Sequence, residues 1–224
     1  ITEGPFGCAG LLSPESQGYL DGMVQCQRIV YGMDILQKGV PNYVLEELKN
    51  KYPLNIPVDV TENLWNIYKT KWMWDQVTNQ ERKVILQKNY RDITVFSGQK
   101  PSEEILYNVE KYPQTEQERK GIIESSKINL YIINRQEQQS VPWQIFEIMS
   151  YGGFLITNYH NGMVDLFEPG REFAYFEDEE DLELKIRIYL SNAERRNEIA
   201  ESAYQKIRNE HLIIHRIREI LSIL

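Results

Sequence analysis

Three polar positions adjoin apolar segments of the sequence and could carry chemistry together. Glu147 is the one carboxylate in the apolar run "FEIMSYGGFLITN", which covers residues 146–158. Arg135 directly follows the run "INLYIIN", and Asn158 ends the run "FLITN". A carboxylate accepts hydrogen bonds from two vicinal hydroxyls, and a guanidinium binds phosphate oxygens. A site with these groups and several backbone amides would suit a polyol joined to a phosphate.

The elements that must position these groups alternate from residue 91 onward. Strands are predicted in "DITVFSG", "SKINLYIIN", "GFLITN" and "EFAYFE", and helices in "QTEQERKGIIESS", around Glu147 and over residues 178–224. Strands that alternate with helices indicate parallel βαβ units. The pattern therefore predicts a Rossmann-like, three-layer α/β domain with a parallel sheet over residues 91–224. Residues 1–90 show helical spacing and predict an N-terminal helical segment.

The positions of the helix around Glu147 and of the next strand decide whether the polar groups meet. Pro142 favours a helix start just after it, and Gly152–Gly153 favours a helix end, because glycine tolerates a left-handed conformation. Ligands of open parallel sheets bind beyond the carboxyl ends of the strands. We therefore expect Arg135 and residues 158–162 to lie along one edge. A helix that starts near Asn161 would add free amides for phosphate or sugar.

Composition excludes several classes of partner. The 224 residues carry a net charge of −8, which disfavours nucleic acid or an anionic membrane surface as the main partner. Two cysteines are too few for a disulfide framework and indicate reduced thiols, hence a cytoplasmic location. The longest apolar runs are too short for a transmembrane segment.

Three further patterns bear on metals and cofactors. The acidic run at residues 177–183 predicts a helix start rather than a cation site. His211 and His215 have metal-ligand spacing but no evident third ligand, so no metal is predicted. No G-x-G-x-x-G motif follows the first strand, which disfavours a dinucleotide cofactor, and no other cofactor is expected.

The run "SKINLYIINRQEQQSVPWQIFEIMSYGGFLITNYHNGMVDLFEPG" resembles the C-terminal half of CgeB-type spore-maturation glycosyltransferases. These enzymes have the GT-B fold of two Rossmann-like halves. The resemblance extends over nearly the whole chain and is most specific between Lys127 and Gly170. It implies that residues 91–224 bind a nucleotide-sugar donor and that residues 1–90 are a helical insert. It also implies a longer protein in which an N-terminal Rossmann-like half precedes this part.

The resemblance also implies roles for individual residues. Glu147 matches the acidic position that binds the ribose hydroxyls of the donor. Arg135 matches an arginine that could neutralise the diphosphate leaving group without a metal. The loop after the third strand supplies further candidates for donor contact: Asn158, Tyr159 and Gly162. His160, in the same loop, is a candidate catalytic base for the acceptor hydroxyl.

Several positions depart from the family pattern. Ser140 and Gln144 replace a glycine and an arginine, and Gly162 stands where the family shows glutamate. Gln139 occupies the first position of an E-x7-E pair that ends at Glu147. Two hypotheses follow. The chain is part of a glycosyltransferase that uses a nucleotide-diphosphate sugar, with a glycan, a protein or a small molecule as acceptor. Alternatively, it is a catalytically inactive, glycosyltransferase-like interaction or scaffold module.

Overall fold

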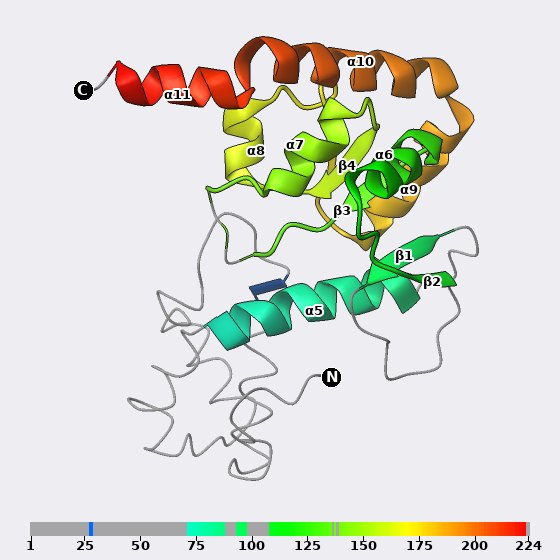
Figure 1. Cartoon of the computed structure of the whole chain (residues 1–224). Helices are drawn as coiled ribbons and strands as arrows, with labels where there is room; N and C mark the ends of the chain where they lie inside the picture. Colours follow the sequence, from blue (N-terminus) through cyan, green and yellow to red (C-terminus); the bar gives the residue numbers. More distant parts are fainter. Residues whose placement is uncertain are drawn as a thin grey trace, which may run out of the picture. The chain divides into compact units, whose positions relative to one another are not determined.

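A computed structural model shows the fold of the chain (Figure 1). It describes residues 27–28, 71–87, 93–97, 108–135, 137 and 139–222. The chain divides into two compact units. The first unit comprises residues 1–88, 102–104 and 134–136, and the second comprises residues 89–101, 105–133 and 137–224.

In the first unit, one long helix is described, α5 (Lys71–Gln87). Val77, Glu81 and Ile85 are buried and recur at every fourth position, so they share one face of the helix. A carboxylate on a buried face needs a charged or hydrogen-bonded partner. Gln27 and Arg28 are also helical, and the rest of the helical segment predicted over residues 1–90 lies outside the described residues. The role of this segment as an insert stays a prediction.

The described residues of the second unit form two parallel sheets. In the smaller sheet, β1 (Thr94–Ser97) pairs with β2 (Asn108–Lys111). In the larger sheet, β4 (Leu155–Asn158) lies between β3 (Asn129–Tyr131) and β5 (Ala174–Phe176). All pairings are parallel, which confirms the predicted α/β class.

Two strand predictions differ from the structure. β2 was not predicted, because its residues "NVEK" contain a single apolar side chain and no apolar run. β3 has three residues, although the apolar run extends to Asn134. Ile133 lies beyond the last ladder pair of β3 and is nevertheless fully buried.

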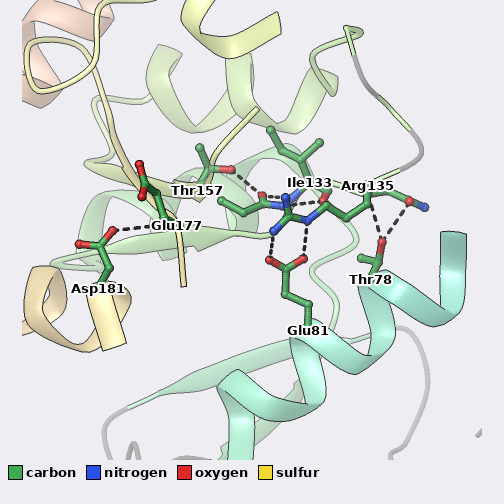
Figure 2. Close-up of polar contacts among 9 residues, drawn as sticks. Thr78, Glu81, Ile133, Arg135, Thr157, Glu177 and Asp181 are labelled. Carbon is green, nitrogen blue, oxygen red and sulfur yellow. Dashed lines mark hydrogen bonds and ion pairs between the residues drawn. The ribbon is translucent and has the colours of Figure 1, made fainter. Parts of the chain in front are cut away.

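Six helices are described in the second unit. They are α6 (Glu116–Ser125), α7 (Trp143–Ser150), α8 (Asn161–Leu166), α9 (Glu179–Ser191), α10 (Ala193–Glu210) and α11 (Ile213–Leu221). Asp178 caps α9 by accepting a hydrogen bond from the amide of Asp181. The Asp181 carboxylate in turn accepts a bond from the amide of Glu177 (Figure 2). The acidic run therefore starts a helix, as predicted.

α7 ends where the glycine pair predicted. Gly152 has a φ of 70°, in the left-handed region. Its amide donates to the carbonyl of Met149 at 3.1 Å, and the amide of Gly153 donates to the carbonyl of Ile148 at 3.0 Å. These two bonds form a Schellman motif, which satisfies the last carbonyls of the helix and turns the chain into β4.

Helices cover both faces of the larger sheet. Successive residues of a strand point to opposite faces. Leu155 belongs to a core cluster with buried residues of α6, α7, α8 and α10. Phe154, on the other face, packs against Tyr189 of α9 with ring centroids 4.6 Å apart. β4 is therefore buried on both faces along its whole length.

Two features of the described helices bear on surfaces. α11 continues past the end of α10 (Figure 1), and Ile213, Ile217 and Ile220 on it are exposed. No described helix combines the length and the hydropathy needed to cross a membrane.

Candidate functional site

Glu147 pairs with an arginine that the sequence analysis did not single out. Arg119 Nε donates to Glu147 Oε1 at 2.7 Å, and the two side chains are 21% and 11% exposed. Glu147 is the fifth residue of α7, and the first turn of α7 holds no acidic residue. Glu147 therefore does not cap the helix. The lone carboxylate in an apolar run is matched instead by a guanidinium from α6.

Arg119 reaches Glu147 because of the way α6 packs. Arg119 and the buried Ile123 are four residues apart, so they share the face of α6 that turns toward the core. The hydrogen bond to Glu147, as the largest cause, raises the pKa of Arg119 above its ordinary value, so the guanidinium stays charged. In the sequence, an arginine one helical turn before an isoleucine was the signal that could have revealed Arg119 as the partner of Glu147.

Asn158, at the end of β4, is bound to the backbone of Ile133. The amide of Ile133 donates to Asn158 Oδ1 at 2.8 Å, and Asn158 Nδ2 donates to the carbonyl of Ile133 at 3.1 Å. Thr157 Oγ1 also donates to Asn158 Oδ1, at 3.2 Å (Figure 2). Asn158 is 1% exposed. Its side chain thus continues the β3–β4 pairing by one residue, and ligand contact by Asn158 stays a prediction.

His160 and Tyr159 lie between β4 and α8. His160 is 7% exposed, and its Nε2 donates to the backbone carbonyl of Glu137. That bond assigns the ring proton to Nε2, so a general-base role would fall to Nδ1. Tyr159 is half-buried, and its ring meets that of Tyr175 edge-on at 5.3 Å. α8 begins at Asn161 with His160 as its N-cap, where the sequence predicted a helix start.

Gly162 is buried under the backbone of Gln139. A Cβ atom at residue 162 would lie 2.0 Å from the carbonyl oxygen of Gln139, which no folded backbone allows. The Glu137 carbonyl bonds His160, and the Gln139 backbone contacts Gly162. These two described residues therefore pack against the start of α8. The glycine at this position is a packing requirement of these residues.

Arg135 belongs to the first unit, where α5 holds it. Its Nε and Nη2 donate to the two carboxylate oxygens of Glu81 at 3.0 and 2.6 Å (Figure 2). Its backbone amide donates to Thr78 Oγ1, which itself donates to Asn134 Oδ1. The side chains of Arg135 and Glu81 are 10% and 3% exposed. This pair supplies the partner that the buried carboxylate on α5 requires, and phosphate binding by Arg135 stays a prediction.

The second unit thus contains Glu147, Asn158, Tyr159, His160 and Gly162, and among the described residues Glu147 pairs with Arg119. A carboxylate can accept hydrogen bonds from sugar hydroxyls, and the guanidinium beside it can donate hydrogen bonds to an anion. Both groups come from helices that pack on parallel strands, in a class of fold that binds nucleotides and sugars at the strand ends.

The comparison with known families agrees with this class. A family model described as "Glycosyl transferase-like" matches residues 86–222, which is more than half of the chain. The chain belongs to this family of glycosyltransferase-like proteins. No curated protein and no solved structure matches it. The CgeB-type resemblance stays a prediction within the family.

Proposed function

We propose that this chain is the donor-binding part of a glycosyltransferase that uses a nucleotide-diphosphate sugar. The observation that carries the proposal is Glu147, a nearly buried carboxylate on α7 that keeps an oxygen for a ligand. Arg119 bonds Oε1, and no described residue donates to Oε2. A free carboxylate oxygen in this setting is suited to the ribose hydroxyls of a nucleotide.

The other candidates take the following parts in the proposal. His160 is the candidate base for the acceptor hydroxyl, acting through Nδ1. Asn158, Tyr159 and Gly162 shape the loop after β4, and Asn158 does so through Ile133. Phosphate binding by Arg135 is a separate prediction, because Arg135 lies in the first unit and its guanidinium bonds Glu81. The proposal needs no metal, and it places the acceptor on an N-terminal half in a longer protein.

Nucleotide binding tests the proposal directly. Uridine, guanosine and adenosine diphosphates at millimolar concentration are added to the purified chain, and thermal unfolding is followed. A ligand at 100 times its dissociation constant stabilises the folded state by about 2.7 kcal/mol. Glu147→Gln should weaken the affinity about tenfold or more, since a charged acceptor is replaced by a neutral one.

Glu124→Gln is the matched control, because Glu124 is an exposed carboxylate on α6 that pairs with Lys120 at 3.8 Å. It should leave nucleotide affinity unchanged. If no nucleoside diphosphate or sugar nucleotide shifts the unfolding temperature of the unmodified chain, the proposal is wrong.

A catalytically inactive interaction module is the second candidate, and one packing contact favours it. The Gln139 carbonyl fills the space of a side chain at residue 162, where the family shows glutamate. The chain therefore replaces an active-site-type side chain by a segment of its own backbone. Gln144→Arg discriminates between the two candidates. Nucleotide binding that stays absent after this substitution supports the module, whereas strong binding by the unmodified chain refutes it.

A further inference from the structure

We propose that Trp143 and Arg119 complete a nucleoside-diphosphate site with Glu147. In this site the nucleobase stacks on the indole, the ribose binds the carboxylate, and the phosphates bind the guanidinium. The inference deepens the proposed function and rests on it. Neither Trp143 nor Arg119 was expected to contact the donor from the sequence.

The first observation is the exposure of Trp143. This indole is 57% exposed, whereas every described phenylalanine is at least half-buried. Trp143 is the first residue of α7, and α7 connects β3 to β4 in a parallel crossover. The start of such a helix lies at the carboxyl ends of the strands, which is the edge where parallel sheets bind ligands. A large aromatic surface is therefore available at that edge.

The second observation is the order of the three side chains. Arg119 Cζ lies 6.0 Å from the centre of the Trp143 ring, and Arg119 Nε bonds Glu147 at 2.7 Å. Trp143 and Glu147 are four residues apart on one helix, so they share a face and are offset by about 6 Å along the axis. That offset is comparable to the distance between a nucleobase and the hydroxyls of its ribose. The guanidinium lies beside both groups.

The third observation is the hydrogen-bonding capacity that remains. Glu147 uses Oε1 alone, and Arg119 uses Nε alone, among the described residues. Nη1 and Nη2 of Arg119 and Oε2 of Glu147 can thus still bond a ligand. In contrast, Arg135 gives both Nε and Nη2 to Glu81. Arg119 is therefore the better placed donor for phosphate oxygens, and Glu147 holds it in orientation without using all of its donors.

The experiment measures the affinity of three probes by calorimetry: uridine, uridine diphosphate and inorganic pyrophosphate. Trp143→Ala removes the stacking of one base on an aromatic side chain, so the affinity for uridine diphosphate should fall about 5- to 150-fold. Pyrophosphate affinity should not change in this variant, because the probe has no base. Trp143→Phe keeps a ring and should recover most of the affinity. Arg119→Lys should lower the affinity for pyrophosphate and for uridine diphosphate, but change the affinity for uridine by no more than about twofold.

Tyr204→Ala is the matched control, because Arg208 Cζ lies 5.6 Å from the Tyr204 ring on α10 in the same kind of cation–π pair. It should not alter the affinity of any probe. If uridine diphosphate binds, Glu147→Gln weakens it and Trp143→Ala does not, the stacking site is refuted and the proposed function stands. If the unmodified chain binds no nucleotide, both are overturned. Loss of pyrophosphate affinity in Trp143→Ala would show that the indole acts by holding Arg119, which also overturns the stacking role.

Discussion

Replacing Asn158 should destabilise the second unit strongly, because its side chain is the hydrogen-bond partner of a buried peptide group. Asn158→Ala removes the acceptor for the Ile133 amide and the donor for the Ile133 carbonyl. Ile133 is fully buried, so water does not replace the lost partner. Each buried polar group left unsatisfied costs about 1–3 kcal/mol. The free energy of unfolding should therefore fall by about 2–6 kcal/mol.

Urea denaturation followed by circular dichroism measures this loss as a lower midpoint at an unchanged slope. Asn158→Asp keeps the side-chain volume but places a carboxylate oxygen where the Asn158 amide group donates to the Ile133 carbonyl. This variant should therefore also lower the free energy of unfolding. Asn161→Ala, at an exposed position three residues on, is the control and should change stability by less than about 0.5 kcal/mol. An Asn158→Ala variant that is as stable as the unmodified chain, but has lost nucleotide affinity, would refute the structural role and favour a ligand contact.

Two further predictions concern packing and pH. Gly162→Ala should lower the free energy of unfolding by about 1–3 kcal/mol, because the added Cβ meets the Gln139 carbonyl. Gly121→Ala should raise it by about 0.5–1 kcal/mol, because Gly121 lies in a helix and its Cβ would enter open space. Urea midpoints of the two variants should therefore move in opposite directions, and equal shifts would contradict the packing argument. Hydrogen bonds from the backbone amides of Thr115 and then Gln114 lower the pKa of Glu118 below its ordinary value of 4.5. The ionised Glu118 carboxylate therefore stabilises the folded state above about pH 4.5, and this contribution is lost as pH falls through the lowered pKa. The stability gap between the unmodified chain and Glu118→Gln should thus narrow between pH 7 and pH 3 in thermal unfolding, and a gap that is independent of pH would show that the carboxylate charge is not involved.

Local signals in the sequence predicted those parts of the fold that depend on neighbouring residues. The glycine pair after α7, the acidic start of α9 and the apolar β4 each act within about one helical turn or one strand. β2 was missed because its position comes from pairing with β1 and not from its own composition. The end of β3 was misplaced because Ile133 is paired with a side chain, Asn158, in place of a strand residue.

The candidate site was predictable in its carboxylate but not in its partners. Glu147 stood out because a charge in an apolar run must be compensated. The compensating charge lies 28 residues earlier, on α6, and only the packing of two helices brings it near. Arg135 is the opposite case. Its position after a strand suggested a ligand contact, but its guanidinium is paired with Glu81, 54 residues earlier. Sequence spacing identifies a charge that needs a partner, whereas the fold decides whether that partner is a side chain or a ligand.

Gly162 shows how a departure from a family pattern should be interpreted. Taken alone, glycine in place of glutamate indicates a lost functional group. The structure gives the position a local cause, because the carbonyl of Gln139 occupies the place of the missing side chain. Gln139 is itself a departure, at the first position of the E-x7-E pair. The contact with Gly162 comes from the Gln139 backbone, which any residue at this position would carry, so it does not depend on the Gln139 side chain. A glutamate restored at residue 162 would meet this carbonyl at its Cβ atom, so a side chain can return to this position only if the backbone at Gln139 moves away from α8.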